Sequence, residues 1–129
     1  MDYTQAREYL LSKPEAIEDF PFGPDVAVFK ICQKMFAAMG TEKNEQGQPE
    51  GRLNLKCEPT QALMLREIFS AVVPGYHMNK KHWNTVILDG SVPQGELKRM
   101  VDHSYALVVK GLPKAKRQGL MAKYGEQVE

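Results

Sequence analysis

The side chains best suited to chemistry gather in one short segment, which mixes imidazoles, lysines, amides and the single tryptophan of the chain. Its members are His77, Asn79, Lys80, Lys81, His82, Trp83 and Asn84. Two adjacent lysines can neutralise backbone phosphates, which supply most of the affinity for nucleic acid. A tryptophan ring can stack on a base, and imidazole or amide groups can bond to a base edge. The segment predicts a nucleic-acid-binding surface, with His82, Trp83 and Asn84 nearest the bases.

The same segment also has a purely structural interpretation. Trp83 opens a predicted strand, and its position alone favours a ring that fills the core. Lys80 and Lys81 would then form a solvated turn. For the two lysines and His82, the binding and the structural interpretations both stay open.

A second basic stretch lies near the C-terminus, where four cations fall within eight residues. They are Lys110, Lys114, Lys116 and Arg117. Cations at the start of a helix oppose the macrodipole, which favours acidic side chains there. The stretch is either a solubilising face or a set of phosphate contacts. If it lies beside Lys80 and Lys81, the two stretches form one basic platform, and the nucleic-acid hypothesis depends on that.

The charge distribution supports a basic surface on one part of the protein. Residues 1–75 hold eight Lys/Arg against eleven Asp/Glu, whereas residues 76–124 hold nine Lys/Arg against three Asp/Glu. The whole chain has a net charge of only +1. A polycationic protein is therefore excluded, but a local basic patch is not.

Asp102 and His103 suggest a carboxylate that orients an imidazole, as in some catalytic sites. Adjacent helical residues do not face each other, so local structural hydrogen bonds are the favoured interpretation. His77 and His82 would need further ligands to bind a metal, with Asp102, His103 and the thiols as candidates. Their spacing matches no zinc pattern, and no phosphate-binding glycine motif occurs. We expect no catalytic residues, no metal and no cofactor.

Length and composition indicate one ordinary globular domain. The chain has 129 residues, of which 43% are hydrophobic and 26% charged. No secretory signal and no membrane-spanning run is present, and two cysteines are too few for a disulfide framework. Cys32 and Cys57 fall in predicted strands, where buried, reduced thiols are expected. These features predict a cytoplasmic protein without a membrane partner.

The pattern of the first half predicts a helix, a hairpin and a second helix. Helical spacing and an Asp2/Gln5 capping box indicate a helix at 3–12, with a short turn at 14–19. Strands at 26–32 and 35–39 would join through residues 33–34. The polar residues 41–51 predict an exposed, mobile loop. A strand at 52–56 and a helix at 59–70 follow.

The second half predicts short strands and then two helices. A turn at 72–75 precedes strands at 76–78 and 83–88. Ser91 is the predicted cap of a helix that Gly111 and Pro113 end. The last helix covers 114–124, and residues 125–129 form a frayed tail. Antiparallel strands with helices on one face of the sheet make an α+β fold.

Several blocks together resemble the MmcQ/YjbR family. The strongest match runs from Val73 to Arg117 and includes the segments 73–86, 89–91, 102–105 and 110–114. Weaker matches lie at 21–24, 29–30, 35–36 and 53–56, so the resemblance covers nearly the whole chain. It implies a frataxin-like α+β fold with an antiparallel sheet. It also implies DNA binding through a "double wing" motif, and the pattern carries no established enzyme activity.

We therefore expect a single domain, residues 1–129, that binds DNA through a basic surface without catalysis. One alternative is a protein-interaction module, in which the 77–84 cluster docks an acidic partner and the sheet face or an edge strand supplies the interface. Another is a small-molecule or metal site around His77, His82, Asp102 and His103.

Overall fold

The computed structural model describes residues 1–75 and 78–128 of the chain. Within these residues the chain forms six strands, four α-helices and a final 3-10 turn. In chain order they are α1 (Tyr3–Leu11), β1 (Ile17–Asp19), β2 (Ala27–Ile31), β3 (Lys34–Lys43), β4 (Pro49–Lys56), α2 (Pro59–Ile68), β5 (Val72–Pro74), β6 (Trp83–Ile87), α3 (Gln94–Lys110), α4 (Lys114–Tyr124) and η1 (Gly125–Val128).

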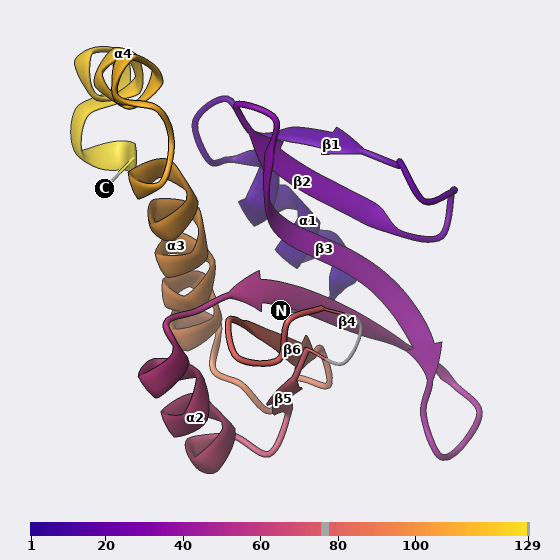
Figure 1. Ribbon diagram of the computed structural model, residues 1–129. Coiled ribbons are helices and arrows are strands. Elements are labelled where there is room, and N and C mark those ends of the chain that lie inside the picture. The colour runs from indigo at the N-terminus through magenta and orange to yellow at the C-terminus, as the bar shows by residue number, and fades with distance from the viewer. Residues whose placement is uncertain (76–77, 129) are drawn as a thin grey trace.

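The strands form one antiparallel sheet in the order β1-β2-β3-β4-β6-β5. Helices α1 and α3 pack on one face of this sheet, and α2 lies beside the start of α3 (Figure 1). The α+β prediction, with an antiparallel sheet and helices on one face, is confirmed.

The core lies between the sheet and helices α1 and α3. Side chains alternate between the two faces of a strand, so Leu53 and Leu55 of β4 point to the helices and are buried. On α3, Tyr105 is buried against Phe36 of β3, with the two rings edge to face and their centroids 5.2 Å apart. Such aromatic pairs add to the free energy gained from burial alone.

Helix α1 begins as predicted, because Asp2 accepts a hydrogen bond from the Gln5 backbone and the Gln5 side chain accepts one from Asp2. The turn predicted at 14–19 is wrong in its second half, where β1 pairs with β2. Arg7 holds this edge strand through two hydrogen bonds to Glu18, of 2.8 and 2.6 Å.

The hairpin between β2 and β3 turns one residue earlier than predicted, at Cys32 and Gln33. Their φ angles are 50° and 68°, so both adopt the left-handed conformation of the tight hairpin turns that match strand twist. Ile31 and Lys34 therefore pair directly. Cys32 lies in a turn and is only half-buried, which corrects the prediction of a buried strand residue, whereas Cys57 is buried.

Residues 41–51 are mostly exposed, as predicted, but the loop is shorter than predicted because β3 and β4 continue into it. Thr41 pairs with Gly51 and Lys43 with Pro49, so only residues 44–48 form the turn. The Asn44 side chain accepts backbone hydrogen bonds from two residues of that turn, each of 3.0 Å. Polar residues join the sheet here because the backbone pairing compensates for their weak strand propensity.

Three further boundaries differ from the prediction. Residues 72–74 form the edge strand β5 rather than a turn, whereas the strand predicted at 76–78 lies largely outside the described residues. Helix α3 begins at Gln94 after Pro93, and Ser91 instead bonds to Asp89. In the tail predicted to fray, residues 125–128 form η1, and Val128 is buried.

Candidate nucleic-acid interface

Strand register determines which side chains lie on the open face of the sheet, the face opposite the helices. Since Leu53 and Leu55 point to the core, Arg52, Asn54 and Lys56 point to the open face. Their partners on β6 are Ile87, Thr85 and Trp83 respectively. Directly opposed residues share a face, and a hydrogen bond from Thr85 Oγ1 to Asn54 Oδ1 joins the two strands there.

A groove of about 730 Å³ lies on this open face. Its aromatic walls are Trp83 and Phe22, and the Phe22 side chain is 76% exposed. The groove floor combines methionines and small residues with Arg52 and Asn54. The remaining lining residues are Asp25, Val26, Met35, Ala38, Met39, Gly40, Thr41, Glu42, Met78 and Asn79.

The groove contains a guanidinium that the protein itself leaves partly unsatisfied. Arg52 Nη2 lies 3.2 Å from Glu50 Oε1, but the buried Nε has no hydrogen-bond partner among the described residues. Asp25 and Glu42 also line the groove, so its charge is mixed rather than purely basic.

The turn that carries Lys80 and Lys81 borders this groove and is held by its own hydrogen bonds. Asn79 accepts at its side chain from the Lys81 backbone, at 2.9 Å, and at its carbonyl from the backbones of His82 and Trp83. Arg66 of α2 donates to the Lys80 carbonyl. The two lysine side chains are exposed, as a phosphate contact requires.

Asn84 faces the opposite side of β6 from Trp83. Its side chain is buried, donates to the Ala62 carbonyl at 3.3 Å and accepts from Arg66 Nε at 2.7 Å. The prediction that Asn84 contacts a base is therefore wrong, because the amide anchors α2 to the sheet. His82 and Trp83 are half-buried, and His77 lies outside the described residues.

The two basic stretches do not meet. Helix α4 lies beyond the far end of α3, whereas the turn that carries Lys80 lies near α2 and β5, at the other end of the molecule (Figure 1). Lys110, Lys114 and Lys116 are exposed, and Arg117 Nη1 donates to the Lys110 carbonyl at 3.0 Å. The expectation of one continuous platform is wrong.

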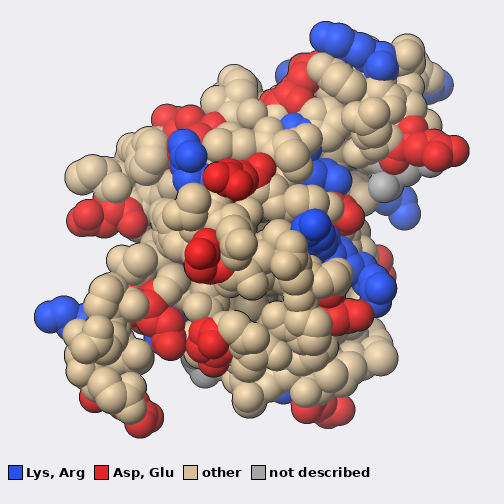
Figure 2. All heavy atoms as spheres, turned by 180° about the vertical axis from the view of Figure 1, so that it is seen from behind, with Lys and Arg blue, Asp and Glu red and all other residues tan. Residues whose placement is uncertain are grey.

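The rear face of the molecule has no continuous basic surface of its own (Figure 2). Figure 2 shows basic and acidic side chains interspersed over that side of the molecule, and neither sign forms a continuous patch there. A nucleic-acid interface built on charge alone has no support on this side. Any such interface depends instead on the aromatic groove of the open sheet face.

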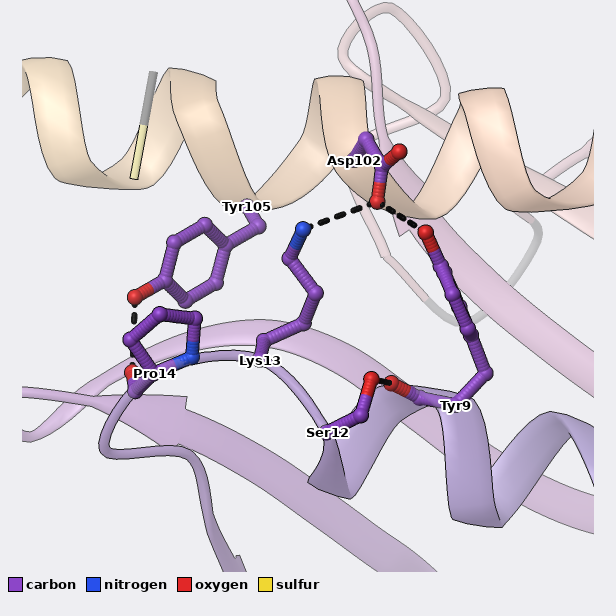
Figure 3. A network of polar contacts seen from close by, with 6 residues as sticks. All are labelled: Tyr9, Ser12, Lys13, Pro14, Asp102 and Tyr105. Atoms are coloured by element: carbon purple, nitrogen blue, oxygen red, sulfur yellow. Dashed lines mark hydrogen bonds and ion pairs between the residues drawn. The ribbon is translucent and has the colours of Figure 1, made fainter. Parts of the chain in front are cut away.

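Asp102 and His103 do not form a dyad, because they point to different neighbours. Asp102 Oδ1 accepts hydrogen bonds from Tyr9 Oη at 2.6 Å and from Lys13 Nζ at 2.8 Å, which ties α3 to the N-terminal segment (Figure 3). Burial, together with the hydrogen bond to Asp102, raises the pKa of Tyr9. His103 faces Glu58 instead.

The described part of the chain shows no metal centre, and Cys57 is not a thiolate nucleophile. No three His, Cys, Asp or Glu side chains among residues 1–75 and 78–128 come together as metal ligands would. Burial raises the pKa of the Cys57 thiol, which keeps it protonated and unreactive at neutral pH. None of the described helices has the length and apolar character of a bilayer-spanning segment.

Comparison with known proteins identifies the family. The YjbR family profile matches residues 11–107. The chain belongs to the YjbR family. "Uncharacterized protein YbdF" of Escherichia coli O157:H7 is 37% identical over 109 residues, covering 84% of this chain and 85% of that one. "Uncharacterized protein YjbR" of Escherichia coli K12 is 34% identical over 121 residues, covering 94% and 98%.

Solved structures agree with the fold. The crystal structure of Deinococcus radiodurans protein DR2400, domain DUF419, has a TM-score of 0.78 and 37% identity, and the match covers 92% of this chain and 87% of that one. A crystal structure of a Pseudomonas syringae protein has a TM-score of 0.75 and 29% identity, with coverage of 83% and 98%. The resemblance predicted from the sequence blocks is confirmed, and family membership establishes the fold rather than an activity.

Proposed function

We propose that this YjbR-family protein binds single-stranded DNA along the open face of its sheet, without catalysing a reaction. The observation that carries the proposal is the position of Trp83, which lines a groove on the helix-free face beside exposed lysines. An open sheet that presents aromatic rings for base stacking is a recurrent solution for unpaired nucleic acid.

The groove suits unpaired bases better than a duplex. A base can stack on Trp83 or Phe22 only if its flat face is accessible, and in a duplex both faces are covered by neighbouring pairs. Lys80 and Lys81 at the border of the groove would contact phosphates, together with Lys56 on the same face. The Arg52 guanidinium lines the groove and carries further N–H groups that can donate to a phosphate or base oxygen.

The residues of the second basic stretch are not part of this surface. Lys110, Lys114, Lys116 and Arg117 lie at the other end of α3, which at 1.5 Å per residue is about 25 Å long. This separation supplies a control for charge, because two lysines can be replaced either beside the groove or in the distant basic stretch.

The test is the binding of a fluorescently labelled mixed-sequence DNA strand, measured by anisotropy at several salt concentrations. Each phosphate contact contributes about −0.7 to the slope of log K against log[salt] for a single strand. The double variant Lys80→Gln/Lys81→Gln should therefore reduce the slope by about 1.4. Lys114→Gln/Lys116→Gln, which removes the same charge, should leave the slope nearly unchanged.

A second variant tests stacking. Base–aromatic stacking is worth about 1–3 kcal/mol, so Trp83→Leu should weaken binding roughly 5- to 150-fold. Because Trp83 is the only tryptophan, quenching of its fluorescence on binding gives an independent readout in the unaltered protein. Absence of binding at low salt, or equal effects of the two lysine double variants, would refute the proposal.

A further inference from the structure

One side chain of α2 reaches the turn, residues 79–82, that carries the two lysines of the proposed DNA surface. The guanidinium of Arg66 is half-buried and makes three hydrogen bonds there. Its Nε donates to Asn84 Oδ1 at 2.7 Å, and its Nη2 donates to the carbonyls of Lys80 and, at 3.4 Å, of Trp83. Arg66 thus connects α2 both to the turn and to the start of β6.

The acceptors of Arg66 are all neutral. None of the ion pairs within residues 1–75 and 78–128 includes this side chain. Hydrogen bonds from an ionised donor are roughly twice as strong as those between neutral groups. The charge of Arg66 therefore strengthens its hold on two backbone carbonyls of the segment that carries the lysines and the tryptophan.

The position of the guanidinium is itself fixed by a buried amide. Asn84 accepts from Arg66 Nε and donates through Nδ2 to the Ala62 carbonyl, at 3.3 Å. Ala62 precedes Arg66 by four residues, so both lie on the same face of α2. With Nε held by Asn84, Nη2 is directed toward the turn.

This pattern of bonds requires a guanidinium. Its N–H groups lie in one plane with fixed directions, so Nε and Nη2 donate to separate acceptors at the same time. A lysine ammonium is a single donor atom at the end of a flexible stem. Arg66→Lys therefore keeps the charge and loses the simultaneous bonds.

We propose that Arg66 is a positioning residue for the DNA surface, which orders the turn at Lys80 and Lys81 and the adjoining Trp83 before DNA arrives. The inference rests on the proposed function. Without the Arg66 bonds, the turn would adopt its binding geometry only together with DNA. The loss of conformational entropy on ordering it would then reduce the affinity.

The first test compares Arg66→Lys with Arg99→Lys, the same replacement at an arginine of α3 that bonds to Glu96 instead. The affinity for the labelled DNA strand is measured by anisotropy, at a temperature where urea unfolding shows both variants to be fully folded. Arg66→Lys should bind on the order of tenfold more weakly than the unaltered protein, and Arg99→Lys equally well. Unchanged affinity of Arg66→Lys would overturn the proposal, because the charge is conserved and only the geometry is lost.

A second comparison separates positioning from direct contact with DNA. In the Lys80→Gln/Lys81→Gln background, Arg66→Lys should cause a smaller fold-change in affinity, since the cations that Arg66 positions are already absent. A phosphate contact made by Arg66 itself, or a general loss of stability, predicts the same fold-change in both backgrounds. That result would overturn the proposal.

The third measurement needs no DNA. The backbone N–H groups of His82 and Trp83 donate to the Asn79 carbonyl at 3.1 and 2.9 Å, and their hydrogen exchange reports opening of the turn. Arg66→Lys should accelerate exchange at these two amides roughly tenfold and leave the amides between β3 and β4 unchanged. Unchanged exchange at the turn would overturn the proposal. Failure of the unaltered protein to bind DNA would instead refute the proposed function, and the exchange rates would still decide whether Arg66 orders the turn.

Discussion

Asp102 connects α3 to the N-terminal segment, and its removal should cost a predictable amount of stability. In Asp102→Ala, the Tyr9 hydroxyl loses a hydrogen bond of 2.6 Å and the Lys13 ammonium one of 2.8 Å. Lys13 is only 14% exposed at its side chain, so water replaces the carboxylate poorly. Its ammonium keeps contacts with two aromatic rings, those of Tyr105 and Tyr9, whose centroids lie 5.2 and 5.9 Å away.

The magnitude follows from these contacts. A hydrogen bond to a charged group is worth about 1.5–3 kcal/mol net. The Asp102 side chain is 44% exposed, so solvent screens the pair and the lower part of that range applies. We expect Asp102→Ala to lower the free energy of unfolding by about 2 kcal/mol, which corresponds to a decrease in Tm of roughly 6–8 °C for a chain of this length.

Urea unfolding followed by circular dichroism measures the change, which should appear in the midpoint with an unchanged m value. Asp25→Ala is the control, because that exposed carboxylate has no ion pair among the described contacts, and its effect should stay within about 0.5 kcal/mol. In a double-mutant cycle with Lys13→Met, the coupling should be about 1 kcal/mol or more. A loss below 0.5 kcal/mol for Asp102→Ala, or no coupling, would refute the assigned role.

Three further substitutions test other parts of the structure. The side chain of Arg7 lowers the pKa of Glu18 below 4.5 by hydrogen bonds and charge. The ionised carboxylate therefore stabilises the fold above about pH 4.5. This stabilisation is lost as the pH falls through the lower pKa that Glu18 has in the folded protein. Glu18→Gln should therefore lose less stability on acidification than the unaltered protein, as measured by urea unfolding between pH 6 and pH 3. Ser104→Ala should cost about 1–3 kcal/mol in chemical unfolding, because it leaves a buried carbonyl and a backbone N–H without their 2.6 and 2.9 Å bonds. Replacing Cys32-Gln33 by Asn-Gly, which suits positive φ angles, should raise the free energy of unfolding by about 1 kcal/mol, and a decrease would contradict the turn geometry.

The helices and central strands were predictable because the capping residues and the spacing of apolar residues lie within their own segments of the sequence. The capping box at Asp2 and the apolar spacing along α3 depend on neighbours in sequence. The edge strands β1 and β5 have three residues each, too few for a pattern, and form because a longer strand lies beside them. Residues 41–43 joined the sheet for the same reason, despite their polarity.

The candidate site was only partly predictable. Trp83 and Asn84 are adjacent in a strand, and a period of two already requires them to face opposite sides, so only one of them could line a surface groove. The length of α3 likewise separates the residues before it from Lys114 and its neighbours. Arg52 was missed as a groove residue, although the alternation with Leu53 indicated its outward position.

The short outer strands have a consequence for how other molecules can be recognised. A strand added at either side of the sheet would find a row of only three residues, and Pro74 in β5 has no N–H to donate. Polymerisation by edge pairing is therefore disfavoured, and so is capture of an extended peptide as a seventh strand. The edge-strand form of the protein-interaction alternative loses support, and recognition must use side chains that project from the broad faces.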